Sequence, residues 1–250
     1  MAFRLSQYSD LLTNLQASGR PMRTVADFLL RPDRNSVVLR HDVDRNVGRA
    51  VRLAELEHRA GVCSSFYFRH GKGGFPASAI RELAAMGHET GFHYETLSVT
   101  GGNAAAALEL FLQQLAEFRK IATCRTICAH GKPLSPWFSG DIAVELVEAA
   151  PDIIGDASAS MPVEQITYLT DAGGRWNSPA VNLRDRIGTM PLNLDPLAPQ
   201  DLAQLLERET SLYISTHPER WCDSKASFMF QSCIDYAAVL VKVIFRMVRL

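Results

Sequence analysis

Short apolar runs rich in β-branched and aromatic residues alternate along this chain with longer segments in which apolar residues recur every three or four positions. The short runs predict seven strands, at 36–41, 63–69, 89–93, 125–129, 152–155, 165–170 and 212–216. The longer segments predict helices within 5–30 and at 48–60, 76–86, 104–120, 141–149, 201–209 and 226–248. Strands that alternate with helices indicate a parallel sheet covered by helices.

This order of elements predicts an α/β fold, a TIM-like barrel or near-barrel in one domain, with an open doubly wound sheet as the alternative. We expect an N-terminal helical extension over 1–35, the barrel over 36–225, and over 226–250 a C-terminal helix that packs on the barrel. No GxGxxG or GxxxxGK[ST] motif follows a predicted strand, so a Rossmann dinucleotide site or a P-loop has no support.

The charge balance and the lack of long apolar segments exclude some classes of function and location. The 250 residues include 26 Lys and Arg and 27 Asp and Glu, so the net charge is −1. Such a balance argues against nucleic-acid binding, which needs a basic face. The N-terminus lacks a signal-peptide pattern, and no run of about 20 apolar residues occurs, so we expect a cytoplasmic protein with reduced cysteines.

Ionisable residues gather where the predicted strands end. Five of the seven histidines lie at such ends, namely His41, His70, His93, His130 and His217. Asp42, Asp44 and Asp171 lie there too. The interior of a parallel strand is nearly all apolar, and the reacting groups of β/α barrels sit at the C-terminal strand ends. Singly, an aspartate there could cap a helix and a histidine could be hydrogen-bonded in the core. Together, they favour metal binding combined with acid–base chemistry.

The ordered segments LRHDVD, GHETGFHYE, AHGKPLS, YLTDAGGRW and LYISTHPERW resemble the motifs of the polysaccharide deacetylase superfamily. This superfamily comprises carbohydrate esterase family four and chitooligosaccharide deacetylases, and the resemblance is to a divergent branch with HDVD and GFHYE motifs. It covers roughly residues 36–220 and implies a distorted (β/α)7 barrel.

The resemblance also implies roles for individual residues. Asp42 matches the catalytic base, His217 the general acid and Asp171 the carboxylate that orients it, whereas Asp44 and His93 match metal ligands. The second motif histidine of the family falls at Leu97, which cannot ligate, so His130 is the preferred third ligand, with Glu95 and His88 as alternatives. The expected metal is zinc, with cobalt or nickel also compatible. The residues expected to contact substrate are His70, Tyr94, Lys132, Arg175 and Trp176.

These roles imply a metal-dependent hydrolase that removes the acetyl group from an N-acetylated sugar or glycan precursor. Hydrolysis of another C–N amide bond, and a degenerate barrel that binds a glycan without turnover, are the alternatives. The C-terminal segment 237–250 carries Lys242, Arg246 and Arg249 at helical spacing and no acidic residue. Such a basic amphipathic helix predicts either contact with a membrane surface or packing across the bottom of the barrel.

Overall fold

A computed structural model of the chain describes residues 3–132, 134–182, 184–191, 194 and 196–248. All seven predicted strands have a counterpart, although the one predicted at 152–155 shares only residue 155 with the observed strand, and among the described residues an eighth strand precedes them. The strands are β1 (Met22–Arg23), β2 (Val37–Val43), β3 (Ser65–Phe68), β4 (Glu89–Tyr94), β5 (Thr126–Ala129), β6 (Gly155–Asp156), β7 (Ile166–Thr170) and β8 (Ser211–Thr216).

Helices fill most of the connections between the strands. The α-helices are α1 (Leu5–Ala17), α2 (Val25–Leu30), α3 (Val47–Arg59), α4 (Ala77–Ala85), α5 (Thr96–Val99), α6 (Ala104–Arg119), α7 (Ala143–Glu148), α8 (Pro199–Leu206) and α9 (Lys225–Val248). Three single turns of 3₁₀-helix are η1 (Ser139–Ile142), η2 (Val163–Gln165) and η3 (Pro218–Arg220).

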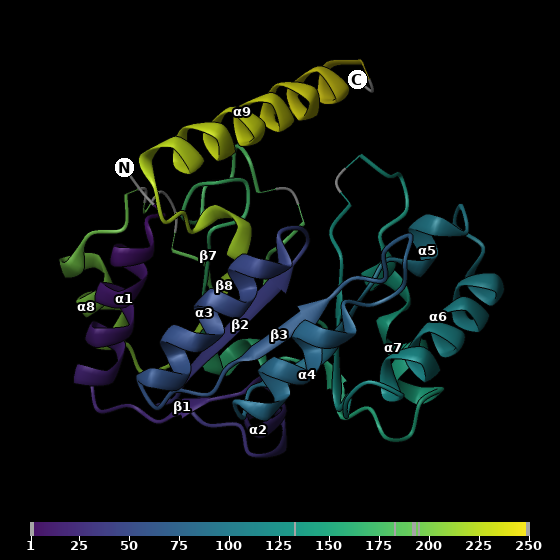
Figure 1. The fold of residues 1–250 in the computed structure, drawn as a ribbon, viewed down its shortest axis with the longest axis horizontal. Coiled ribbons are helices and arrows are strands. Elements are labelled where there is room, and N and C mark those ends of the chain that lie inside the picture. The colour runs from purple at the N-terminus through teal and green to yellow at the C-terminus, as the bar shows by residue number, and fades with distance from the viewer. Residues whose placement is uncertain (1–2, 133, 183, 192–193, 195, 249–250) are drawn as a thin grey trace.

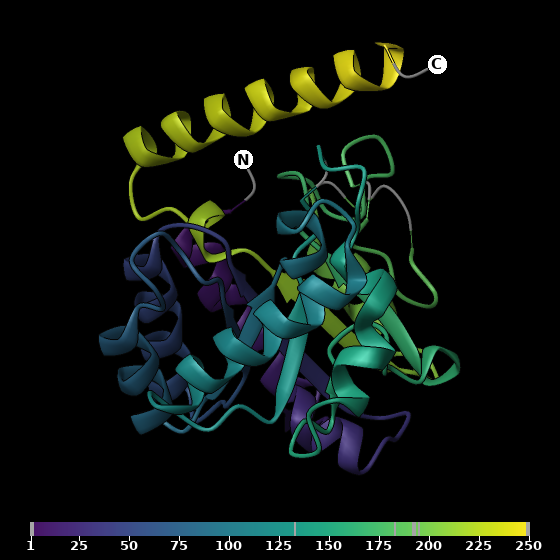
Figure 2. The same ribbon diagram turned by 90° about the vertical axis from the view of Figure 1, so that its right-hand side faces the viewer.

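The strands form one parallel sheet in the order β6-β5-β4-β3-β2-β8-β7, which curls into a half-barrel (Figures 1 and 2). Among the described residues no strand ladder joins β6 to β7, so the expected α/β class is confirmed, whereas closure into a complete barrel is not. β1 pairs with the start of β2, with Met22 beside Val37. The N-terminal segment therefore contributes a strand to the sheet, beyond the helices predicted for it.

Side chains fill the interior of the curled sheet. Tyr67, Tyr168 and Tyr213 are buried there with aliphatic neighbours from several strands. The Tyr213 hydroxyl donates to the Ala157 carbonyl at 2.7 Å, which links β8 to the segment after β6 across the open side. The interior is therefore a packed core, as in closed β/α barrels.

Both faces of the sheet are covered, which explains the apolar runs in the sequence. All seven residues of β2 are buried. α6 follows the capping residue Asn103, whose side chain accepts from the Ala106 amide, and it buries Phe111 and Phe118 on one face.

On β4, a Cβ at Gly91 would lie 2.5 Å from the Tyr67 ring, so glycine is needed where β3 and β4 pack together.

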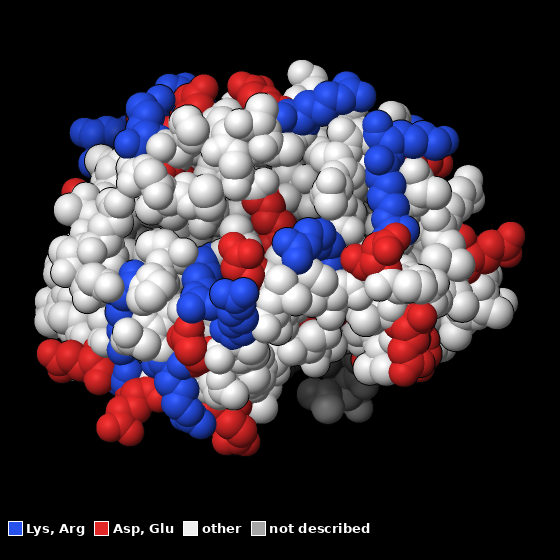
Figure 3. Space-filling view, turned by 90° about the horizontal axis from the view of Figure 1, so that it is seen from below, with Lys and Arg blue, Asp and Glu red and all other residues white. Residues whose placement is uncertain are grey.

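The two ends of the molecule differ. α9 lies across the end toward which the strands point their C-termini (yellow in Figure 1), and its Asp235 lines the pocket found there. The start of α9 therefore lies at the C-terminal end of the sheet. Packing across the bottom of the barrel, one of the two predictions for the C-terminal segment, is wrong for this part of the helix. On the face opposite α9, cationic and anionic side chains are interspersed, a pattern typical of a solvated surface (Figure 3).

Candidate functional site

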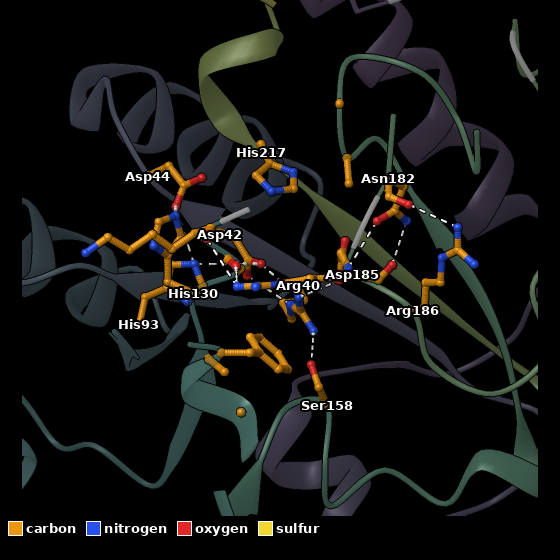
Figure 4. A pocket seen from close by; sticks show the side chains of 18 of the residues that line it. Arg40, Asp42, Asp44, His93, His130, Ser158, Asn182, Asp185, Arg186 and His217 are labelled. Atoms are coloured by element: carbon orange, nitrogen blue, oxygen red, sulfur yellow. Dashed lines mark hydrogen bonds and ion pairs between the residues drawn. The ribbon is translucent and has the colours of Figure 1, made fainter. Parts of the chain in front are cut away.

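A pocket of about 500 Å³ opens at the C-terminal ends of the strands. Its lining brings together five residues that the sequence assigned to catalysis or metal binding, and Figure 4 shows their side chains around one cavity. They are Asp42, Asp44, His93, His130 and His217. They come from the ends of β2, β4, β5 and β8, as expected for parallel strands that share one edge.

Three of these side chains form a group that could hold a metal ion. One ligand atom each from Asp44, His93 and His130 lies within 4.8 Å of the other two. Asp44 Oδ1 is 3.3 Å from His93 Nε2 and 3.4 Å from His130 Nε2. This oxygen is buried and accepts no hydrogen bond. An orphaned carboxylate oxygen between two imidazole nitrogens fits a divalent cation, because buried polar atoms otherwise find partners.

The hydrogen bonds behind the two imidazoles orient them for a cation. His93 Nδ1 lies 2.9 Å from the Cys128 carbonyl oxygen, which can only accept, so Nδ1 carries the proton. His130 Nδ1 lies 3.2 Å from a Glu95 carboxylate oxygen in the same way. In the neutral imidazoles both Nε2 lone pairs then point toward Asp44. Carbonyl or carboxylate partners of this kind are typical behind metal-bound histidines.

The electrostatics of the group also suit a cation. Burial raises the pKa of Asp44, but His130 and His93 outweigh it and hold that pKa well below its usual value. Burial lowers the pKa of His130, but the nearby Asp44 carboxylate and the hydrogen bond to Glu95 outweigh it and raise that pKa to about 9. In the metal-free protein a proton therefore occupies the place of a cation, and metal binding would release it.

A second group of possible ligands is less suitable. Asp42, His93 and Cys128 also lie within reach of one another. However, Asp42 is already engaged by Arg40, and burial raises the pKa of the Cys128 thiol well above its usual value. A neutral thiol and an engaged carboxylate are poorer metal ligands than the orphaned Asp44 oxygen.

Asp42 forms a buried ion pair. The Arg40 guanidinium donates from Nε to Asp42 Oδ1 at 2.9 Å and from Nη2 to Oδ2 at 2.8 Å. Burial raises the pKa of Asp42, but the Arg40 charge outweighs this and lowers the pKa below its usual value. Asp42 is thus ionised at neutral pH and held in a fixed orientation by a bidentate contact.

Arg40 extends from Asp42 across the interior of the sheet. Its Nη1 donates to the Ser158 hydroxyl at 3.1 Å, and its Nη2 lies 3.2 Å from Asp185. Asp185 in turn accepts from the hydroxyls of Tyr168 at 2.6 Å and Thr170 at 2.5 Å. These contacts connect Asp42 to the loop after β7, which forms another side of the pocket (Figure 4).

A buried carboxylate, Asp171, holds His217 at the rim of the pocket (Figure 4). Its Nδ1 lies 2.6 Å from Asp171 Oδ1, and its backbone amide donates to both Asp171 oxygens at 3.1 Å. The Trp221 indole also donates to Asp171, at 3.2 Å. Burial and Arg220 lower the pKa of His217, but Asp171 outweighs them and raises it to about 9. At neutral pH His217 is therefore a protonated imidazolium.

The residues expected to contact substrate are distributed more widely. Lys132 lines the pocket, but His70, Tyr94, Arg175 and Trp176 are not among its described lining residues. His70 bonds to Glu117 on α6 at 3.1 Å, and Arg175 is exposed elsewhere.

The two aromatic residues in that set have structural surroundings. Tyr94 is fully buried, and its hydroxyl donates at 3.0 Å to Asp156, which lines the pocket in its place. Trp176 packs against Phe3 and Trp221 and lines a separate, smaller cavity. Its large ring is buried among these aromatic rings, away from the main pocket.

The alternatives to His130 as the third ligand are also placed. Glu95 supports His130 and pairs with Arg69 at 2.7 Å, so it lies behind the ligand group. His88 lies in a different buried network, where its Nδ1 is 3.7 Å from Glu57. Leu97 is buried in the hydrophobic core on α5.

Sequence reasoning missed several lining residues. Asn182, Asp185 and Arg186 belong to a segment between β7 and α8 that has no regular periodicity, and Asp235 belongs to α9. Arg40 could have been recognised from the sequence. A charged residue in the middle of a buried parallel strand needs an oppositely charged or hydrogen-bonding partner nearby.

Comparison with known proteins adds no assignment: the sequence matches no family model and no curated protein sequence. Among the described residues, no helix combines the length and apolarity needed to cross a membrane.

Proposed function

We propose that this protein is a metal-dependent hydrolase that removes the acetyl group from an N-acetylated sugar or glycan precursor. The observation that carries the proposal is the convergence of Asp44, His93 and His130 around one orphaned carboxylate oxygen inside the pocket. Asp42 and His217 flank that group, and the resemblance of the motifs to polysaccharide deacetylases names the substrate class.

In this proposal Asp44, His93 and His130 hold a divalent cation, with zinc the best match to one carboxylate and two imidazoles. When bound, such a cation lowers the pKa of coordinated water and polarises a carbonyl oxygen. Cobalt or nickel suits the same donor set. His93 Nδ1 donates to the Cys128 carbonyl and His130 Nδ1 donates to Glu95, and these hydrogen bonds keep both Nε2 atoms directed inward.

The residues of the chain itself supply the proton transfers. Asp42, kept ionised by Arg40, accepts the proton of the attacking water. His217 is protonated at neutral pH and tied through Nδ1 to Asp171, so its Nε2 is the atom that donates to the leaving amine. Two groups with pKa values displaced in opposite directions are typical of an acid–base pair.

The pocket also suits a sugar. Its volume of about 500 Å³ lies within the usual range for small-molecule sites. Lys132, Ser158, Asn182 and Arg186 line it and offer side-chain donors and acceptors to hydroxyl groups.

The test measures metal content and product together. Wild type loaded with zinc is expected to hold about one equivalent and to release acetate from N-acetylated sugars. Asp44→Ala, His93→Ala and His130→Ala should each lose metal and activity. His58→Ala is the matched control, because His58 lies on the outer face of α3 and bonds to the Met86 carbonyl.

Each outcome has a defined meaning. A wild type without metal after supplementation would overturn the proposal. Metal lost in the Asp44 and His93 variants but kept in His130→Ala would overturn His130 as the third ligand. Metal binding without acetate release, but with cleavage of a different amide, would replace the deacetylase with another C–N hydrolase.

A further inference from the structure

We propose that α9 binds the surface of a membrane that contains anionic lipids, with its outer apolar face inserted among the headgroups. The helix spans 24 residues, which corresponds to about 36 Å at the usual rise per residue. It lies across the pocket end of the molecule in both ribbon views (Figures 1 and 2).

The outer face of α9 is unusually apolar. The three most exposed large apolar side chains among the described residues all lie on this helix: Met229 at 68%, Phe230 at 70% and Tyr236 at 67%. Met229 and Tyr236 are seven residues apart, with the exposed Cys233 between them, so they share one stripe of the helix. Exposed apolar residues scattered singly are ordinary, but a stripe of them on one helix indicates a contact surface.

The opposite face of α9 is attached to the protein through polar side chains and also carries the partly buried Phe228 and Ile234. Gln231 is buried, and Asp235 lies 3.7 Å from Arg220 and 4.0 Å from Arg45. The body of the protein thus holds this inward face and leaves the stripe of Met229, Cys233 and Tyr236 turned outward. An interfacial helix has this arrangement, with one face for acyl chains and the other for water or protein.

Charge identifies lipid as the occupant of the apolar stripe. Residues 225–250 carry four Lys or Arg and one Asp, whereas the whole chain has a net charge of −1. The last 14 residues contain three cations and no acid, at helical spacing. A local excess of cations in the segment that carries these apolar residues complements an anionic headgroup region. Because the described helices do not meet the requirements of a membrane span, the helix would lie on the surface.

Docking through α9 would place the pocket beside the headgroups, because Asp235 of this helix lines the pocket. The binding itself does not depend on the proposed chemistry, so its test needs no substrate. If both proposals hold, a lipid-linked sugar becomes the class of substrate to examine first.

The full-length chain is sedimented with vesicles of phosphatidylcholine alone and of phosphatidylcholine mixed with phosphatidylglycerol. We expect binding to the mixed vesicles that weakens with added salt. The double variant Met229→Glu/Phe230→Glu should bind these vesicles at least roughly tenfold more weakly than wild type. Val144→Glu on α7 is the matched control, because Val144 is 63% exposed and distant from α9 in sequence and in the fold.

A second variant tests the charge. Lys242→Glu/Arg246→Glu should lower binding to the mixed vesicles while circular dichroism shows a folded protein. Absence of vesicle binding by the wild type would overturn the proposal, as would equal loss in Val144→Glu. A wild-type dimer that Phe230→Glu converts to a monomer, without vesicle binding, would assign the stripe to a second copy of the chain instead.

Discussion

Replacing Asp171 by Asn tests how the carboxylate controls His217. The substitution keeps the shape of the side chain but removes the charge that outweighs burial and Arg220, the two influences that lower the pKa of His217. In the folded variant that pKa should fall from about 9 to below the usual 6.5. Asp171 is fully buried, so solvent would not compensate for the lost charge.

The effect on stability follows from linkage. A pKa raised from 6.5 to about 9 in the folded state means that protonated His217 stabilises the protein fully below pH 6.5. This stabilisation is lost as pH rises through about 9. The shift corresponds to about 3 kcal/mol at 1.36 kcal/mol per pKa unit. The wild-type advantage over Asp171→Asn should therefore be largest at pH 6 and shrink by about that amount by pH 9.5.

The assay is urea unfolding of the metal-free protein, with a chelator present, at a series of pH values between 6 and 9.5. His130 titrates in the same range in both proteins, so its contribution cancels in the difference. Asp152→Asn is the control, because that side chain is 85% exposed. If the difference between wild type and Asp171→Asn does not change with pH, Asp171 does not hold His217 in its protonated form.

Three further substitutions test the packing and the buried charges. Gly91→Ala should cost about 1–3 kcal/mol in urea unfolding, because its Cβ would overlap a buried ring, whereas Gly73→Ala should be nearly neutral because nothing lies within 4 Å. Arg40→Met should cost about 3–5 kcal/mol in the same assay, since it leaves Asp42 buried without its cation; a loss below 1 kcal/mol would contradict the role of the pair. Glu57→Gln should destabilise the protein at pH 7 and do so progressively less as the pH falls below 4.5, because the charge of His41 outweighs burial and lowers the folded-state pKa of Glu57; an effect that does not change with pH would count against this.

The fold was predictable where a local pattern carries the information. Seven strands follow from short, mainly apolar runs, because a parallel strand buried on both faces has few polar positions away from its ends, Arg40 of β2 being an exception. β1 has two residues and no such pattern, and its place depends on pairing with Val37 across intervening chain. Closure of the barrel is likewise a property of long-range pairing between β6 and β7, for which neither segment carries a signal.

The residues of the candidate site likewise fall into those that a local sequence pattern predicts and those that it does not. Residues that end strands were predictable, because parallel strands bring their C-terminal ends to one edge. Asp185 lies in an irregular segment between β7 and α8. The sequence there has no hydrophobic periodicity from which its contact with Arg40 could be predicted. Trp176 was assigned to the pocket from its place in a motif, yet it packs with Phe3 near the N-terminus, a contact between distant parts of the chain.

Strand register explains how His130, the third ligand of the proposed metal group, comes to lie beside His93. In the ladder between β4 and β5, His93 lies beside Cys128. His130 is two positions beyond Cys128, so the period of two in a strand puts its side chain on the same side of the sheet as His93. Position 97 lies beyond the end of β4 in α5, where Leu97 packs into the core. A histidine just beyond the neighbouring strand can therefore lie within reach of His93 and Asp44, which is the group that could hold a metal ion.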